Sequence, residues 1–452
     1  MMNIFVRGGK HMNKHPLKSI VKAQKSKIPV GIYSACTANE LVIEAVMERG
    51  LGYNNFILIE ATANQVNQYG GYTGMKPADF RDFIFSQAQK TGFPKEKIIL
   101  GGDHLGPLTW KHLKAEKALE ESKELVKQFV LAGFSKIHLD TSMYLADDDT
   151  NSKLDTEVIA ERGAILCEVA EKAFAELRAN DAKALQPVYV VGSEVPIPGG
   201  SLEEEGMHIT KAADFKDTVE AFKTAFYNRG LNSAWENVVA VVVQPGVEFG
   251  DESIHEYNRL AAGELRHALQ GYSNLVFEGH STDYQTAGAL KKMVEDGIAI
   301  LKVGPALTFA LREGLFALNH IENELFNDIP DFNRSNFMNV LDSAMVNNSE
   351  YWVKYYHGSR KSMELARKYS FSDRCRYYLP MREIKESLDL MTGNLKTGEI
   401  PLTLISQYMP VQYNKIRNGL LKNNVESLVK DKVVNCIDTY LEATHLDTSF
   451  KW

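Results

Sequence analysis

Two short strings of this sequence place an imidazole close to a carboxylate, and they are the first candidates for a reactive centre. The string GGDH ends in Asp103, a carboxylate suited to proton transfer, and His104, an imidazole suited to metal binding. The string EGHSTD contains His280, and Glu194 lies in a stretch rich in glycine and proline. Two imidazoles and a carboxylate, with coordination positions left open, predict a site for a catalytic divalent cation.

Polar residues also stand at or near the ends of eight runs that have the composition of β-strands. When parallel strands close into a barrel, active residues gather where the strands end. We therefore expect one mouth to collect these side chains, and we assign several of them to substrate binding. The strand-end residues are Cys36, Glu60, Asp103, Asp140, Glu194, Gln244, His280 and Lys302. The substrate-binding candidates are Glu60, Gln65, Gln68, Asp140, Ser281, Asp283 and Lys302.

Gln65 and Gln68 belong to a long loop, residues 61–76, that follows the second of these runs and is rich in amides. Long loops in compact folds are often functional, and amides both donate and accept hydrogen bonds, as sugar hydroxyls require. Two other residues receive a structural interpretation. His138 lies inside a strand and is expected to line the barrel or its core. Cys36 has no neighbour in sequence that would lower its pKa, so a nucleophilic role is not favoured.

The elements that must position these residues alternate between strands and amphipathic helices. Residues 238–243, VVAVVV, are typical of a parallel strand that is buried on both faces. Eight such strands predict a (β/α)₈ TIM barrel, and an open doubly wound sheet is the alternative. No dinucleotide or P-loop fingerprint is present. The expected strands are 29–34, 56–60, 98–101, 136–140, 188–191, 238–243, 275–278 and 299–303. The expected helices are 39–48, 115–132, 156–178, 213–228 and one that opens at Pro77.

The strand-like runs stop near residue 328, and helical patterns continue to the end. We expect an N-terminal extension at 1–17, a barrel at 18–328 and a helical C-terminal region at 329–452, with helices at 336–345, 383–391 and 425–441. This last region is expected to cover one face of the barrel or to form an oligomer interface.

Composition excludes several classes of protein. The net charge of −7 argues against general nucleic-acid binding, and no apolar run is long enough to cross a membrane. The start of the chain lacks the hydrophobic segment of a secretory signal. Four scattered cysteines are typical of reduced thiols in a cytoplasmic protein.

Several long strings closely resemble the GatZ/KbaZ family, known as the second subunit of tagatose-1,6-bisphosphate aldolase. The resemblance extends from about residue 18 to about residue 440 and rests on ILGGDHLGP, AGFSKIHLDTSM, GSEVPIPGG, VVVQPGVEF and EGHSTDYQT, among others. It implies carbohydrate metabolism, and some relatives in the family are metal-dependent ketohexose 4-epimerases.

The family in turn resembles class II aldolases, in which an Asp-His pair supplies the proton-transferring carboxylate and one metal ligand. The resemblance implies Asp103 as that carboxylate and a metal shell of His104, Glu194, Gln244 and His280. Gln244 stands where those aldolases have a further histidine. If Glu194 does not bind metal, it is a candidate second base. The metal would be Mn²⁺, Zn²⁺, Ni²⁺ or Co²⁺. At the phosphate-binding end this chain has Gly-Pro-Ala at 304–306, which differs from the aldolases.

The predicted function is therefore a divalent-metal-dependent 4-epimerase of tagatose and fructose, or of their phosphates, that acts at C3–C4 by aldolase-like chemistry. Two alternatives stay open. One is a non-catalytic subunit that stabilises a class II tagatose-1,6-bisphosphate aldolase, and the other is a sugar-binding barrel without turnover. The partners expected are the ketohexose or its phosphate, a catalytic aldolase subunit and further copies of this chain.

Overall fold

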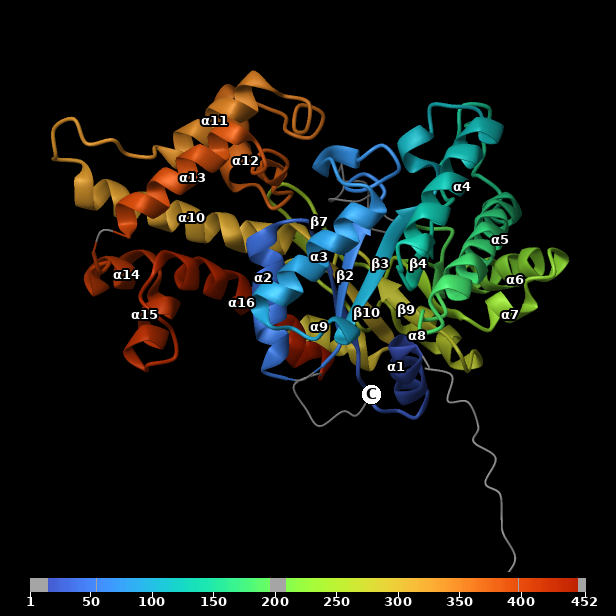
Figure 1. Ribbon diagram of the computed structural model, residues 1–452. Coiled ribbons are helices and arrows are strands. Elements are labelled where there is room, and N and C mark those ends of the chain that lie inside the picture. The colour runs from blue at the N-terminus through green and yellow to red at the C-terminus, as the bar shows by residue number, and fades with distance from the viewer. Residues whose placement is uncertain (1–14, 54, 196–208, 397, 446–452) are drawn as a thin grey trace, which may run out of the picture.

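Eight parallel strands close into a barrel in this computed structural model, which describes residues 15–53, 55–195, 209–396 and 398–445 (Figure 1). The order around the barrel is β1-β10-β9-β6-β5-β4-β3-β2, so strands adjacent in the chain are neighbours throughout. The predicted TIM barrel is confirmed. Its strands are β1 (Ile32–Cys36), β2 (Ile57–Thr62), β3 (Ile98–Leu105), β4 (Lys136–Leu139), β5 (Val188–Val191), β6 (Val238–Val243), β9 (Val276–Gly279) and β10 (Ile298–Val303).

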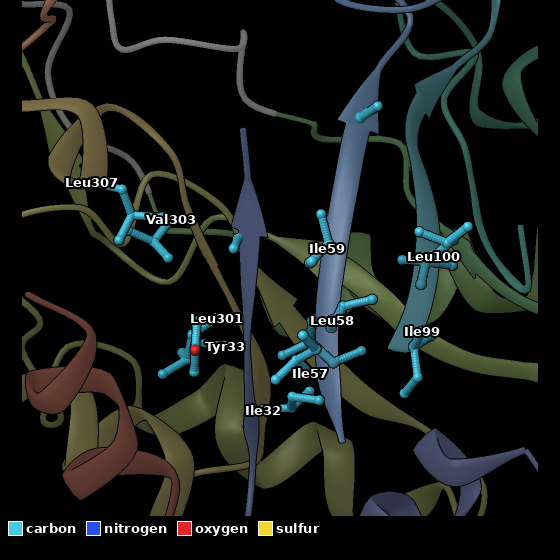
Figure 2. Packing of buried hydrophobic residues seen from close by; sticks show 14 of the residues in the cluster. Ile32, Tyr33, Ile57, Leu58, Ile59, Ile99, Leu100, Leu301, Val303 and Leu307 are labelled. Atoms are coloured by element: carbon cyan, nitrogen blue, oxygen red, sulfur yellow. The ribbon is translucent and has the colours of Figure 1, made fainter. Parts of the chain in front are cut away.

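The strands form because their apolar residues are buried on both faces. Figure 2 shows this packing around β1, β2 and β3, where Ile57, Leu58 and Ile59 occupy successive positions of one strand. Leu301 and Val303 of β10 and Leu307 of the next helix continue the same core. A short antiparallel pair, β7 (Glu248–Phe249) and β8 (Ile254–His255), follows β6 and stands apart from the barrel sheet.

Amphipathic helices surround the barrel, and side-chain caps fix the starts of two of them. At the start of α2 the Asn39 side chain accepts a hydrogen bond from the amide of Val42. At the start of α9 the Thr286 hydroxyl oxygen accepts one from the amide of Ala289. The helices are α2 (Glu40–Leu51), α3 (Pro77–Thr91), α4 (Ala115–Leu131), α5 (Thr156–Asn180), α6 (Ala212–Asn228), α7 (Asn232–Trp235), α8 (Gly263–Ala268) and α9 (Ala287–Glu295).

Helix α1 (Pro16–Lys25) lies at the start of the described chain, where the sequence analysis placed no helix. It precedes the barrel and contacts both β6 and β10. Its apolar residues Leu17 and Ile20 are buried, and His15 caps its start by accepting from the Leu17 amide. Residues 1–14 of the predicted extension lie outside the described residues.

His15 predicts a sensitivity of the fold to acid. Burial, assisted by Lys18, lowers the pKa of its imidazole from 6.5 to about 3, so the native state keeps it neutral. Below about pH 6.5 the His15 imidazole takes up a proton in the unfolded chain but not in the native chain. Native stability is therefore lost as the pH falls toward 3. Between about pH 7.5 and about pH 5, this proton uptake should lower the unfolding free energy of the wild type by about 2 kcal/mol. His15→Asn keeps a capping oxygen but does not titrate, so we expect its unfolding free energy to fall by about 2 kcal/mol less over the same range. Urea unfolding at both values tests this, and an identical pH dependence in the two proteins would contradict it.

After β10 the described chain is helical, so the predicted helical C-terminal region is confirmed. Figure 1 shows α11 to α13 beside the barrel along α10, and α16 running back toward α2. None of the helices described in these ranges is both long and apolar enough to cross a membrane. The helices are α10 (Pro305–Phe326), α11 (Phe337–Asn347), α12 (Arg360–Tyr369), α13 (Arg382–Leu395), α14 (Leu402–Tyr408), α15 (Pro410–Arg417) and α16 (Val425–Thr444).

Helix α16 completes the ring of helices around the barrel. It packs against α9, α2, α10 and strand β1, the position expected for a helix between the eighth strand and the first. The amide of Gly31, just before β1, donates to the carbonyl of Thr444 at 3.0 Å. Lys430 forms ion pairs with Glu44 and Glu48 of α2 at 2.5 and 2.8 Å. The last described helix is therefore part of the barrel's outer layer.

The C-terminal region should not fold when it is expressed alone as residues 329–452. Its helices are short, and α16 buries its apolar residues against the barrel, which the fragment lacks. We expect weak helical circular dichroism and rapid proteolysis of the fragment. A cooperative thermal transition of the isolated fragment would contradict the prediction.

Candidate active site and metal centre

The end of β3 brings two adjacent side chains to the same place. Side chains in a strand normally alternate between its faces. Here the register with β4 shifts between Gly102 and Leu105, and His104 has a φ of 50°. A left-handed backbone at a residue other than glycine is a strained conformation typical of functional positions. The irregularity allows Asp103 and His104 to reach one site together.

Three imidazoles and one carboxylate meet at this site. One potential ligand atom from each of Asp103, His104, His138 and His280 lies within 4.8 Å of the others, and all four residues are buried. The ring centroids of the three histidines are 4.9 to 5.3 Å apart. Three nitrogen donors and an adjacent carboxylate form the kind of donor set that holds a catalytic divalent cation.

Each imidazole has a carboxylate partner on one of its nitrogens, which leaves the other nitrogen for a metal. In His104 that other nitrogen, Nε2, lies 3.5 Å from Asp103, the carboxylate of the same cluster. Nδ1 of His104 is 2.7 Å from Asp140, Nδ1 of His138 is 2.8 Å from Asp103, and Nε2 of His280 is 3.0 Å from Glu278. Such carboxylates fix the tautomer and the orientation of metal-binding histidines. Nε2 of His138 is buried and has no hydrogen-bond partner. These residues therefore fit a divalent cation.

Beneath the histidines, a buried network of ion pairs fills the barrel. Lys136 lies between Glu60 and Glu278 at 2.9 and 2.8 Å, and Lys302 lies 2.7 Å from both Glu60 and Asp103. Together with Asp140, which pairs with His104, the network contains four carboxylates and two ammonium groups, so carboxylates outnumber ammonium groups in a buried place. Unbalanced buried charge is costly, and a divalent cation held by neutral imidazoles would balance it.

The electrostatics of the site set the charge of its members. Burial would raise the pKa of Asp103, but His104 and Lys302 hold that pKa well below its ordinary value, so the carboxylate is ionised. Burial would lower the pKa of His104, but Asp103 and Asp140 raise it. Burial lowers the pKa of His280 to about 3, so this imidazole stays neutral.

A cavity of about 830 Å³ opens above the cluster, large enough for a sugar and its substituents. Its floor is formed by Asp103, His104, His280 and Lys302. Its lining also includes residues of the C-terminal region, which therefore contributes to the site as well as to the fold. Those residues are Glu350, Tyr351, Lys354, Tyr355, Arg374, Arg376 and Tyr377.

The structure places the predicted oxygen ligands Glu194 and Gln244 outside the cluster. One carboxylate oxygen of Glu194 is 3.3 Å from Lys153, and the other is buried without a hydrogen-bond partner. The Gln244 amide oxygen accepts from the backbone of Gly246 and Val247 at 2.9 and 3.0 Å. Neither residue lines the cavity. Residues 196–200 of the glycine-rich stretch lie outside the described residues.

The predicted substrate-binding residues are divided between the cavity and its supports. Gln65, Ser281, Asp283 and Lys302 line the cavity. Glu60 is buried within the ion-pair network, and Asp140 holds His104. The side-chain amide of Gln68 instead donates a hydrogen bond to the carboxylate of Glu121 at 2.9 Å.

Cys36 also lines the cavity, but its thiol is not poised to act as a nucleophile. Burial raises its pKa to about 12, so the thiolate is scarce at neutral pH.

Asp283 fills a place where barrels often bind phosphate, the start of the helix after the last strand. Its carboxylate accepts from the amides of Gly304 and Ala306 at 3.0 and 2.8 Å. Burial raises the pKa of Asp283 to about 6.

Sequence reasoning missed His138 because it lies within a strand and not at its end. A signal was available, since Lys136, His138 and Asp140 alternate along β4. Residues with a spacing of two share one face of a strand. Three polar residues on one face of a strand that must be buried indicate a polar barrel interior.

Comparison with known proteins agrees with this fold. Residues 17–445 match the family described as "D-tagatose-1,6-bisphosphate aldolase subunit GatZ/KbaZ-like". Curated relatives named D-tagatose-1,6-bisphosphate aldolase subunit GatZ, from Salmonella agona and Klebsiella pneumoniae, are each 47% identical over 94% of this chain and 98% of their own length. A crystal structure of a Sinorhizobium meliloti protein, named a probable tagatose 6 phosphate kinase, is similar to this chain with a TM-score of 0.83 and 41% identity. The match covers 91% of this chain and 100% of the Sinorhizobium chain. The chain therefore belongs to the GatZ/KbaZ-like family of D-tagatose-1,6-bisphosphate aldolase subunits.

Proposed function

We propose that this chain is a divalent-metal-dependent ketohexose 4-epimerase, acting on fructose and tagatose or their phosphates at the C3–C4 bond. The observation that carries the proposal is the cluster of three imidazoles, each braced by a carboxylate, beside an ionised Asp103 in a sugar-sized cavity. A structural scaffold would have no need of this buried donor set.

In the proposed reaction, Asp103 accepts the proton of the 4-hydroxyl group. The C3–C4 bond then breaks, C4 becomes an aldehyde carbon, and the bonding electrons pass into the enediolate formed by C2 and C3. A bound divalent cation would supply Lewis-acid stabilisation of negative charge at the C2 oxygen. Re-addition of C3 to the opposite face of the aldehyde inverts C4, and Asp103 returns the proton. His138 and Lys302 hold Asp103 in position for both transfers.

A second route to the same product would remove the hydrogen at C4, with Glu194 as the base. The two routes differ in their isotopic outcome, because only deprotonation can exchange the C4 hydrogen with solvent. We favour the bond-cleavage route, since Asp103 lines the cavity and Glu194 does not. Retention of the C4 hydrogen during turnover in D₂O is the expected result.

The proposed metal shell consists of His104, His138 and His280, and we expect about one divalent ion per chain. The double variant His104→Ala/His280→Ala should lose the ion, because a single imidazole cannot hold it against solvent. His138→Ala should lower occupancy as well. Elemental analysis of purified proteins, after dialysis against Mn²⁺ or Zn²⁺, measures the effect.

His267→Ala is the matched control, since this histidine is exposed on α8 and should leave occupancy unchanged. Full occupancy in the double variant would end the proposal of a metal centre at this site. Glu194→Gln and Gln244→Ala should keep the ion. Loss of metal in either variant would show that the substituted residue is a metal ligand.

A second function is favoured by the relatives, which are named as aldolase subunits. In that case the chain stabilises a separate class II tagatose-1,6-bisphosphate aldolase and has no turnover of its own. Assays of the purified chain with fructose and tagatose, with and without added Mn²⁺ or Zn²⁺, separate the two functions. An inactive chain that raises the thermal stability of a partner aldolase would establish the subunit role in place of the epimerase.

A further inference from the structure

A second hollow, which we call the basal groove, lies at the opposite end of the barrel from the metal cluster. Its volume is about 330 Å³, and it is lined by α1, by the start of β6 and by residues 273–274, which precede β9. The barrel strands are parallel and the clustered histidines lie near their carboxyl ends, so a groove at their amino ends is remote from that site. Figure 1 shows α1 at the bottom of the barrel.

Three lysines of α1 line the basal groove. Lys18, Lys22 and Lys25 are separated by four and three residues, so they lie along one face of the helix. Among the described lining residues, Glu236 is the one carboxylate. The whole chain carries a net charge of −7, so this excess of positive charge is a property of the groove. A local excess of one sign in a concave place attracts ligands of the opposite charge.

Two of the three ammonium groups are positioned by neutral oxygen atoms. Nζ of Lys18 donates to the side-chain oxygen of Asn237 at 2.6 Å and to the backbone carbonyl of Glu236 at 3.3 Å. Nζ of Lys25 donates to the backbone carbonyl of Leu269 at 3.4 Å. Such bonds orient a cation without cancelling its charge. An ammonium group carries three N–H donors, so Lys25 retains donors for a ligand.

Lys25 is partly buried, and its charge is poorly compensated. Burial lowers its pKa from 10.5 to about 8, and among the described residues no carboxylate opposes this shift. An ammonium group that has lost part of its hydration gains more from an anion than a fully hydrated one does. The groove therefore offers an anion one partly desolvated cation beside two others.

The charge and the lining of the groove indicate the kind of anion. Three lysines and one glutamate leave an excess of two positive charges in the lining. A phosphate ester carries about −1.5 to −2 near neutral pH, and its several oxygens can accept from more than one ammonium group. Val21, Val238 and Val239 also belong to the lining and provide apolar contacts for a carbon skeleton.

We propose that the basal groove is a binding site for a phosphate group, either free or carried by a small metabolite. Lys18, Lys22 and Lys25 supply the charge that binds its oxygens. The groove shares no lining residue with the cavity above the metal cluster. The site is therefore separate from the one to which the epimerase reaction is assigned.

Pyridoxal 5′-phosphate tests the proposal by labelling the intact protein. Its aldehyde condenses with the neutral amine of Lys25, so that a C=N bond forms and water leaves. Sodium borohydride then delivers hydride to the imine carbon while the nitrogen takes a proton from water, which fixes the label for peptide mass spectrometry. At about pH 8 about half of the Lys25 amine is neutral, whereas exposed lysines remain protonated. We expect pyridoxal phosphate to label Lys25 about tenfold faster than pyridoxal, which lacks the phosphate.

Two matched variants separate the groove from general lysine reactivity. Lys22→Met removes one ammonium group from the lining and should reduce the advantage of pyridoxal phosphate at Lys25 from about tenfold to about twofold. Lys22 is exposed, so the variant should fold normally. Lys27→Met is the control, because Lys27 is also exposed and follows α1 but does not line the groove. It should leave the labelling of Lys25 unchanged.

Protection experiments distinguish the two sources of phosphate. Protection of Lys25 by inorganic phosphate and by glycerol 3-phosphate at equal concentrations would support a site for free phosphate. Protection by glycerol 3-phosphate at about tenfold lower concentration would support a site for a phosphorylated metabolite.

Three results would overturn the proposal: equal labelling of Lys25 by pyridoxal and its phosphate, an unchanged advantage in Lys22→Met, or no protection by either phosphate. None of these measurements depends on metal binding or on turnover of a ketose. Failure of the proposed function would therefore leave them unaffected, and their failure would leave the proposed function unaffected.

Discussion

Asp103→Asn should lower kcat by about 10²- to 10⁴-fold, the usual contribution of a general acid–base group. Asparagine has nearly the same shape as aspartate but cannot take a proton from the 4-hydroxyl group. The three histidines remain, so metal content should not change. Steady-state assays with fructose and tagatose, combined with elemental analysis of the same samples, measure both quantities.

Glu350→Gln is the matched control for this variant. It also neutralises a carboxylate that lines the cavity, but one outside the metal cluster, and should retain activity within a few-fold. Wild-type activity in Asp103→Asn would show that another group moves the proton. Loss of metal in this variant would instead assign Asp103 to the metal shell.

Lys136→Met should cost about 3–5 kcal/mol of unfolding free energy, the largest effect on stability that we expect from one substitution. Lys136 is fully buried and is the shared partner of Glu60 and Glu278. Removing it leaves two carboxylates in a buried place with one ammonium fewer to balance them. Glu278 also orients His280, so metal affinity should fall in the same variant. Urea unfolding and elemental analysis measure the two consequences.

The double variant Lys136→Met/Glu60→Gln removes one charge of each sign and should recover part of the lost stability. Lys172→Met is the control, because its ion pair with Glu168 lies on the surface of α5, where such pairs contribute about 0–1 kcal/mol. A loss below about 1 kcal/mol in Lys136→Met would mean that water or a protonated carboxylate already relieves this charge.

The barrel could be predicted from the sequence because its strands are buried on both faces. The runs 188–191 and 238–243 match β5 and β6 at both ends, since both consist almost entirely of valine and end where the valines end. The helix that opens at Pro77 was also placed at its first residue. The boundaries of such elements follow from local composition, so they can be predicted without knowledge of the tertiary packing.

The positions of α1 and α16 could not be predicted in this way. A helical pattern was recognised over 425–441, but periodicity does not tell which surface a helix covers. Only the contacts of α16 with α2 and α9 reveal its place in the ring.

The candidate site was predictable where residues lie at strand ends, as Asp103, His104 and His280 do. It was not predictable for His138, because its role depends on the β4 face that turns inward. Glu194 is predicted as a ligand from its residue type and its glycine-rich surroundings, and Gln244 from the family resemblance. Their side chains in the structure have other partners, which no local sequence pattern discloses.

The position of α16 has a consequence for how the protein is made. A chain is synthesised from its N-terminus, so the last of the eight strands is complete more than a hundred residues before Val425 is added. Until then the groove beside β1, which α16 covers, stays exposed on a nascent barrel. A segment that is translated after all eight strands therefore completes the layer that the first strand needs. A ribosome that stalls before α16 would hold an unfinished barrel with apolar surface available to chaperones.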